Sequence, residues 1–195
     1  MPITINGTGS IAGLAAGGLP DGTVTTADIA AGAVTQAKRS EQLTQGTAVA
    51  TTSGTSIDFT GIPSWARRIT VMFGAVSTNG SSIFLLQLGS GSVQTTGYSG
   101  TIWTDASSGQ FTTGFPLFSP VSAANNAVGI VQLASMGSNI WSQSGILAFG
   151  NIQSTGWSSA GFTQSALSGA LDRIRLTTVN GTDAFDGGII NILYE

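Results

Sequence analysis

The stretch "RRITVMFGAVSTNGSSIFLLQL", residues 67–88, contains the clearest strand pattern in the sequence. Its first half alternates apolar and polar residues, as a half-buried β-strand does. The residues expected on one face of this strand are Ile69, Val71, Phe73 and Ala75. Asn79-Gly80 follows, and this dipeptide is the strongest short-range signal for a β-hairpin. The mostly apolar run "SIFLLQL" then predicts the returning strand of that hairpin.

Runs of the same kind recur along the chain from about residue 47 onward. They cover residues 57–59, 127–135, 144–152, 161–167, 172–179 and 188–195. About eight short strands separated by turn residues predict an all-β fold, an antiparallel β-sandwich or jelly roll. We expect "NGTDAFDGG" to form the turn of a last strand pair, with Phe185 packed on the core and the final strand inside a sheet.

The composition limits the classes of function. Charged residues make up 8% of the chain, about a third of the usual fraction, and the net charge of -3 provides no general attraction to nucleic acid. The chain has no cysteine and no histidine, so disulfides, thiolate metal sites and the commonest general acid/base are missing. We therefore expect neither an enzyme nor a cofactor or metal. The start lacks the features of a signal peptide and no long apolar run occurs, which predicts synthesis in a cytoplasm without membrane insertion.

The distribution of charge is uneven. Between Ile69 and Leu171, Asp105 is the only formally charged residue. Hydroxyl and amide groups can face water, so one interpretation is a polar but uncharged surface. Depletion of charge is also typical of the cores of subunit interfaces, because desolvating ions is unfavourable. We expect a homo-oligomer, and for a β-rich head on a low-complexity stem we favour a homotrimer.

We divide the chain into an extended segment with short helical turns, residues 1–46, and a β-sandwich head, residues 47–195. The segment contains no aromatic residue and cannot bury enough apolar surface to fold alone. The pattern "VTTAD" at residues 24–28 recurs as "VTQAK" at residues 34–38, with threonines that can cap short helical turns. The apolar residues expected to dock onto a partner or onto other copies are Ile3, Ile5, Ile11, Leu14, Leu19, Val24, Ile29 and Val34. The alternative is a flexible linker.

Four aromatic residues are candidates for binding a ligand. Trp103, Trp141 and Trp157 each lie among small polar residues, which suits a platform that stacks on a host glycan, and Tyr98 has the same surroundings. The alternative for each is packing in the core or at an interface, where aromatic residues are also enriched.

The few charged side chains of the head have simple expected roles. Asp183 and Asp186 flank a turn and are expected to stabilise it, because six or more oxygens would be needed to bind Ca²⁺. The arginines are Arg67, Arg68, Arg173 and Arg175. Anion binding is one interpretation of these arginines, and pairing across strands with Asp58 or Asp172 is the other.

Two parts of the sequence resemble proteins of tailed bacteriophages. The strings "GGLPDGTV", "TTADIA" and "AVTQAK", within residues 17–38, resemble the N-terminal segment of tail-fibre and appendage proteins. "IDFTGIPSWARRITVMFGAVSTNGSS" and "IRLTTVNGTDAFDGGIINILYE" resemble a β-sandwich domain of virion proteins. The resemblance covers the first 45 residues, about 57–97 and 171–195, and leaves out about 98–170, where variable ligand-binding loops are expected in such a family.

The resemblance implies a structural virion protein, assembled in the host cytoplasm. It implies a tail fibre or spike that other virion proteins hold through its N-terminal segment, with a head that meets the host surface. No catalytic residue carries over. The alternatives are a fibre that decorates the capsid or collar and a non-enzymatic carbohydrate-binding module.

Overall fold

The computed structural model describes residue 27, residue 29 and residues 43–103, 108–152 and 156–195. The chain divides into two compact units, Met1–Ser40 and Glu41–Glu195, and the second unit is the head. The head confirms the predicted fold class, because its strands form two antiparallel sheets packed as a sandwich. β1 and β2, the first strands of the head, lie at residues 44–45 and 49–50.

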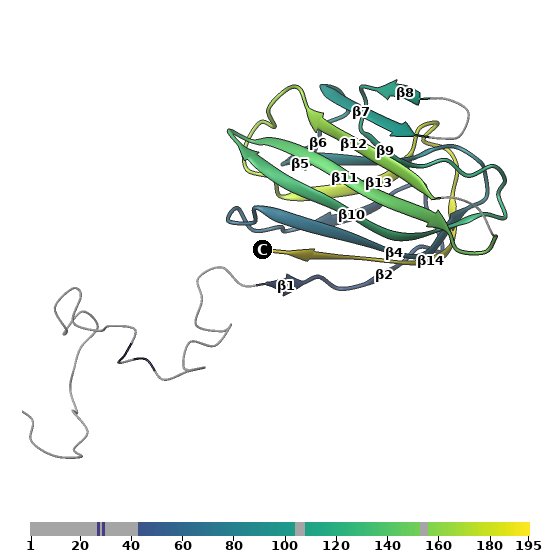
Figure 1. Ribbon diagram of the computed structural model, residues 1–195, viewed down its shortest axis with the longest axis horizontal. Coiled ribbons are helices and arrows are strands. Elements are labelled where there is room, and N and C mark those ends of the chain that lie inside the picture. The colour runs from purple at the N-terminus through teal and green to yellow at the C-terminus, as the bar shows by residue number, and fades with distance from the viewer. Residues whose placement is uncertain (1–26, 28, 30–42, 104–107, 153–155) are drawn as a thin grey trace, which may run out of the picture. The chain divides into compact units, whose positions relative to one another are not determined.

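The larger sheet has nine strands, and in Figure 1 they run side by side across the front of the head. In spatial order they are β1 (Thr44–Gln45), β14 (Phe185–Tyr194), β4 (Arg68–Thr78), β10 (Asn126–Gly137), β11 (Ile140–Phe149), β12 (Trp157–Thr163), β7 (Tyr98–Trp103) and β8 (Ser108–Phe111), with β2 (Val49–Ala50) also paired to β14. The smaller sheet contains β3 (Ile57–Thr60), β13 (Arg173–Thr178), β5 (Phe84–Ser90) and β6 (Ser92–Val93), with β9 (Phe115–Phe118) also paired to β5.

The core lies between the sheets and follows from alternation along the strands. Ile69 and Val71 of β4 are buried from the larger sheet, and Leu86 of β5 and Leu176 of β13 are buried from the smaller one, in the same core cluster. Each side chain of this size that becomes fully buried stabilises the fold by about 1.5–3 kcal/mol. Phe118 packs edge-on against Phe149 with ring centroids 4.9 Å apart, which joins β9 of one sheet to β11 of the other.

The predicted hairpin at Asn79-Gly80 is wrong. β4 belongs to the nine-stranded sheet and β5 to the five-stranded sheet, so the turn carries the chain from one layer to the other. Asn79 donates its backbone N–H to the carbonyl of Ala184 and accepts the Ala184 N–H on its side chain, both at 2.9 Å. A turn dipeptide sets the local bend, whereas these contacts with the β13–β14 connection set the direction in which the next strand leaves.

The last predicted strand pair is partly correct. β13 and β14 exist, but they lie in different sheets, so "NGTDAFDGG" is a second crossover between layers. Two other predictions for this region are confirmed: β14 is inside a sheet, between β1 and β4, and Phe185 is buried.

The alternation predicted for residues 69–75 holds as far as residue 73 and fails at residue 75. Ile69, Val71 and Phe73 are buried as predicted, but Ala75 is exposed and Val76 is buried in its place. Ala75 has a φ of 55° and lies where the pairing of β4 shifts register against both of its neighbouring strands. A β-bulge inserts one residue, and this insertion reverses the inward and outward positions beyond it.

Candidate functional site

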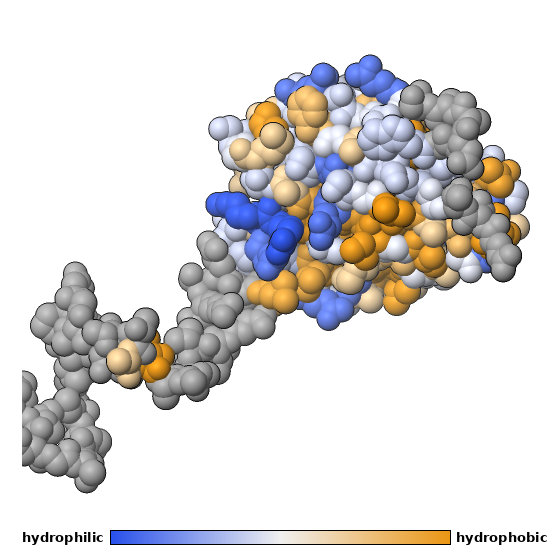
Figure 2. Space-filling view, viewed as in Figure 1, coloured by the Kyte–Doolittle hydropathy of each residue, from blue (hydrophilic) through white to orange (hydrophobic). Residues whose placement is uncertain are grey.

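The outward side of β7, β10, β11 and β12 carries no charged residue; we call it the uncharged face. Apolar side chains on this face are exposed, including Ile130 at 50%, Ile146 at 61% and Trp103 at 52%. In Figure 2 the same face is mostly orange and pale, with deep blue near the C-terminal end of β14 and further blue surface at the centre and along the upper rim of the head.

Strand register aligns these side chains in a row. Ile130 of β10 is paired with Met72 of β4 on one side and with Ile146 of β11 on the other. Ile146 is paired in turn with Ser158, and Ser158 with Trp103. A shallow hollow of about 450 Å³ lies over Ile130 and Ile146, between Gln132 and Ser159. The face therefore offers a continuous contact surface of apolar, hydroxyl and amide groups.

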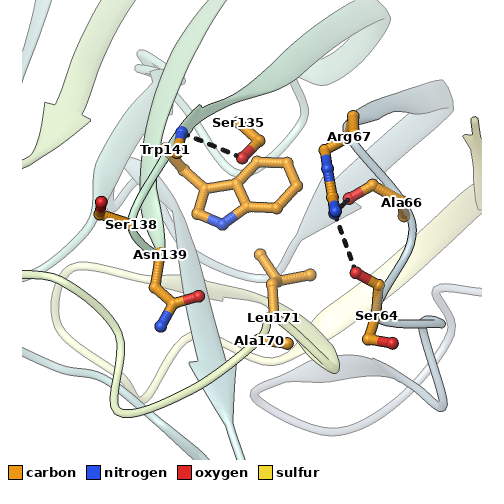
Figure 3. A pocket seen from close by; sticks show the side chains of 10 residues that line it. Ser64, Ala66, Arg67, Ser135, Ser138, Asn139, Trp141, Ala170 and Leu171 are labelled. Carbon is orange, nitrogen blue, oxygen red and sulfur yellow. Dashed lines mark hydrogen bonds between the residues drawn. The ribbon is translucent and has the colours of Figure 1, made fainter.

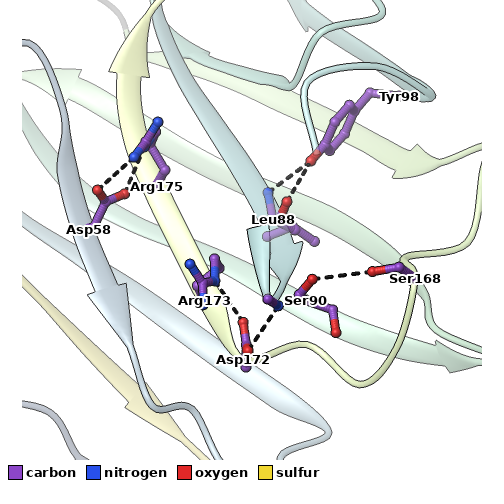
Figure 4. Close-up of polar contacts among 9 residues, drawn as sticks. Asp58, Leu88, Ser90, Tyr98, Ser168, Asp172, Arg173 and Arg175 are labelled. Atoms are coloured by element: carbon purple, nitrogen blue, oxygen red, sulfur yellow. Dashed lines mark hydrogen bonds and ion pairs between the residues drawn. The ribbon is translucent and has the colours of Figure 1, made fainter. Parts of the chain in front are cut away.

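The outward side of the five-stranded sheet has the opposite character, as Figure 4 shows. Arg175 of β13 donates two hydrogen bonds to the carboxylate of Asp58 on β3, at 2.7 and 2.8 Å. Arg173 donates to Asp172 at 2.8 Å, and this hydrogen bond is the main reason why the pKa of Asp172 is lowered. The predicted cross-strand pair is confirmed for Arg175 with Asp58, whereas Arg173 pairs with its sequence neighbour Asp172, and Arg67 and Arg68 pair with neither aspartate. The outward side of the smaller sheet therefore carries two ion pairs, Arg175 with Asp58 and Arg173 with Asp172.

Arg67 and Arg68 lie at one end of the sandwich, where β4 begins. Arg68 forms an ion pair with the side chain of Glu195. Arg67 differs, because within the described part of the chain its side chain has no carboxylate partner. Its Nη1 donates to the carbonyl oxygens of Ser64 and Ala66, at 2.9 and 3.2 Å.

A pocket of about 250 Å³ adjoins Arg67; we call it the end pocket (Figure 3). The residues that line it are Ser64, Ala66, Arg67, Ser135, Gly137, Ser138, Asn139, Trp141, Ala170 and Leu171. In Figure 3 the indole of Trp141 lies between the side chain of Arg67 and the Ser138–Asn139 turn. Arg67 and this turn were not predicted as parts of one site, because only the fold brings residues 64–67, 135–141 and 170–171 together.

Tyr98, one of the four predicted binding residues, is fully buried. Its hydroxyl accepts the Leu88 N–H at 2.8 Å (Figure 4). The hydroxyl also donates to the Gln94 carbonyl at 2.9 Å, and the ring packs edge-on against Phe115. Burial raises the pKa of Tyr98 to about 12, although the hydrogen bond from Leu88 acts in the opposite direction. Tyr98 thus has the packing role that was the alternative for this residue.

The three tryptophans do not form one platform. Trp157 is buried against Phe149, with ring centroids 6.0 Å apart, whereas Trp103 is exposed on the uncharged face. Trp141 is 4% exposed and contributes to the wall of the end pocket. The ladder between β11 and β12 runs from Ser142 to Leu147, so Trp141 and Trp157 lie at its opposite ends.

Asp183 stabilises the β13–β14 connection, as predicted, whereas Asp186 lies within β14 and bonds to β4. Asp183 accepts the Ser82 N–H at 2.9 Å and a hydrogen bond from the Asn180 side chain at 2.6 Å. Asp186 accepts from the Ser77 hydroxyl at 2.5 Å. Among the residues described, no group of three or more His, Cys, Asp and Glu side chains could hold a metal ion.

Most residues proposed to dock the N-terminal segment lie outside the described residues; Ile29 is described and is exposed. Over the described ranges, no helix has the length and apolar character needed to cross a membrane.

Together these features define an all-β sandwich with one uncharged face and one polar end pocket. No family model matches the chain, and comparison with curated proteins and with solved structures finds no match either.

Proposed function

We propose that this chain is a non-catalytic structural protein of a tailed-bacteriophage virion. In this proposal three copies form a fibre or spike by packing their uncharged faces around a common axis. The N-terminal segment attaches the trimer to other virion proteins, and the heads face outward, where they contact the host surface.

The uncharged face is the observation that supports this proposal most directly. Exposed isoleucines in a surface without charge can be buried against another protein without desolvating an ion. A second copy is the partner that fits, because two faces without charge bring no like charges together and neither leaves an ion unpaired. Closed symmetric assemblies of identical chains are the common outcome of such contacts.

Two features support the virion role. The strings that resemble a tail-fibre attachment segment precede those that resemble a virion β-sandwich domain, and the N-terminal segment contains no aromatic residue. A segment without aromatic residues needs a partner surface in order to be held. The non-catalytic role is supported by a sequence without histidine and cysteine.

The test of assembly is the mass of the full chain in solution. Sedimentation velocity at micromolar concentration should give three times the mass of one chain, and Ile146→Lys should yield a folded monomer, because an ammonium group would be buried in the contact. Val179→Lys is the matched control, since Val179 is also exposed but follows β13 in the other sheet. A monomeric wild-type chain, or equal effects of the two variants, would contradict the proposed interface.

The test of location uses virions labelled with an antibody against the head. Label at the tail supports the fibre or spike, whereas label on the capsid or collar supports the decoration fibre. Purified virions without the protein would contradict both roles.

A further inference from the structure

We propose that the end pocket binds one sugar ring that carries a carboxylate, such as a uronic acid or a sialic acid. This site is separate from the uncharged face, and its ligand is bound by a single head whether or not heads associate.

The charge of the pocket indicates an anion. Arg67 brings one positive charge to the pocket, and among the described residues no carboxylate neutralises it. Two carbonyl oxygens hold Nη1, which leaves Nε and Nη2 without a partner within the described ranges. A guanidinium edge with two free donors matches a carboxylate in a bidentate arrangement. One positive charge also matches a monoanion better than a phosphate ester, which carries nearly two negative charges at neutral pH.

The backbone holds Arg67 in a fixed position. Its N–H donates to the Glu195 carbonyl at 2.7 Å, and its own carbonyl accepts the Ser135 N–H at 2.8 Å. The start of β4 is thus fixed to the end of β14 on one side and to β10 on the other. With its backbone fixed and its Nη1 bound to two carbonyl oxygens, the Arg67 side chain loses less freedom when a ligand binds, which favours affinity.

The rest of the pocket suits a sugar. Trp141 lines one wall of the pocket and is 4% exposed, so its indole offers a small apolar contact to a bound ring. The opposite rim is the turn between β10 and β11, where Ser138 and Asn139 have φ angles of 51° and 59°. The Asn139 carbonyl accepts the Leu167 N–H at 3.1 Å, so the turn is fixed against the loop after β12.

The polar groups of the rim remain available. Among described residues, the hydroxyls of Ser64 and Ser138 and the side-chain amide of Asn139 have no hydrogen-bonding partner, and all three residues are exposed. Such neutral donors and acceptors match the hydroxyls of a sugar. The volume of about 250 Å³ lies below the range of pockets for drug-sized ligands, which begins at about 300 Å³. A single ring is therefore the expected ligand.

The test measures binding to the full chain by ligand-observed NMR and by the shift of the Trp141 indole N–H signal. The probes are D-glucuronate and N-acetylneuraminate, with D-glucose and acetate as comparators. We expect at least one acidic sugar to bind with a Kd of about 1 mM or below, and glucose and acetate at least about tenfold more weakly, because each comparator lacks half of the recognised groups.

The variant Arg67→Gln should weaken binding of the acidic sugar by about 10- to 100-fold, the usual effect of losing a charge-assisted hydrogen bond. Arg68→Gln is the matched control, because it removes the same charge one residue along the chain, from a side chain that does not line the pocket, and it should change the Kd less than about twofold. Asn139→Asp should also weaken binding, because it places a negative charge on the rim without disturbing Arg67.

Three results would overturn the proposal. The first is no saturable binding of either acidic sugar. The second is equal binding of acetate, or tighter binding of a peptide with a free C-terminal carboxylate, because both would indicate a carboxylate site without sugar recognition. The third is the same loss of affinity in Arg67→Gln and Arg68→Gln when both variants have wild-type circular dichroism.

Discussion

The hydroxyl of Tyr98 connects the two sheets of the head. The tyrosine belongs to β7 of the larger sheet, and the Leu88 N–H that it accepts belongs to β5 of the smaller one. In water this N–H would bond to solvent, but here it is buried and depends on the phenol oxygen. The phenol oxygen of Tyr98 therefore accepts a backbone N–H that would otherwise be buried without a hydrogen bond.

The raised pKa of Tyr98 predicts a loss of stability at alkaline pH. Burial makes the folded protein hold the phenol proton more tightly than the unfolded chain, whose tyrosine pKa is near 10. This contribution is fully present below pH 10 and is lost as the pH rises to about 12, and two pKa units correspond to roughly 3 kcal/mol. Urea unfolding at a series of pH values between 8 and 12 measures it.

The variant Tyr98→Phe separates this residue from other alkaline effects. It should reduce stability by about 1–3 kcal/mol at neutral pH, because the Leu88 N–H loses its partner, and it should flatten the decline above pH 10. Tyr194→Phe is the control and should keep the decline, because it leaves the Tyr98 phenol in place. An unchanged decline in Tyr98→Phe would show that other groups cause it.

The roles of single residues were harder to predict than the strands. Tyr98, Trp103, Trp141 and Trp157 share small polar neighbours in the sequence, yet Trp103 is exposed and the other three are core residues, of which Trp141 also lines a pocket. Local composition indicates a polar environment along the chain, whereas burial depends on which strand covers the ring. The sequence did contain a signal for the uncharged face, because β10 has apolar residues on both of its sides. Val131 points to the core, and its neighbour Ile130 is exposed.

At the scale of elements, β4 and β14 bulge at the same place. The pairing passes from Gly187 with Ser77 directly to Ile189 with Gly74, so Gly188, Ala75 and Val76 lie inside the irregularity. Gly188 has a φ of 96°. A Cβ at this position would overlap the carbonyl oxygen of Ala75 and lie 2.6 Å from the Cα of Val76. The bulge thus depends on the missing side chain.

The variant Gly188→Ala should therefore destabilise the head by about 3 kcal/mol or more, because a strained φ and a backbone overlap act together. Gly181→Ala is the matched control, since Gly181 also has a positive φ of 68° but a Cβ there would meet nothing within 4 Å. The free energy of unfolding of Gly181→Ala should fall by only about 1 kcal/mol. Chemical unfolding of both variants provides the comparison, and equal losses would show that the overlap at Gly188 is relieved.

Sequence patterns predicted most of the longer strands, missed β1, β2, β6, β7, β8 and β9, and predicted strand partners poorly. Alternation in β4 and β13 was visible because each strand has one side that faces the core. Both predicted hairpins were instead crossovers, because a two-sheet fold can use a tight turn to change layer as easily as to reverse direction within one. β9 was not predicted, because all four of its residues are buried and no alternation marks it.

At the scale of the whole molecule, the sequence predicted that charge is scarce but could not predict where the remaining charges lie. Asp58 and Arg175 are 117 residues apart in the sequence, and pairing of β13 with β3 brings them to one face. The opposite face is left to isoleucine, serine and glutamine. This separation gives the head one surface that is stable in water and one that is better suited to contact with protein.

The first two strands, β1 and β2, cover the β14 edge of the larger sheet, and this role differs from that proposed for the N-terminal segment. β1 and β2 both pair with β14. Gly46, which follows β1, donates its N–H to the Ile192 carbonyl at 2.8 Å. Thr51, which follows β2, donates its N–H to the Gly188 carbonyl at 3.0 Å. Residues 44–51 thus cover an edge that would otherwise be free to pair with other chains.

Two deletions should therefore have different effects. Removal of residues 1–40, the first compact unit, should leave the head with a Tm within about 2 °C of the full chain, whereas removal of residues 1–51 should lower the Tm by about 10 °C and cause aggregation. Scanning calorimetry and light scattering measure both effects. If residues 1–40 attach the protein to the virion, as we propose, the shorter deletion should yield folded heads that virions fail to incorporate. Incorporation at the wild-type level would show that the head itself holds the attachment site, because the deleted chain retains every strand of both sheets.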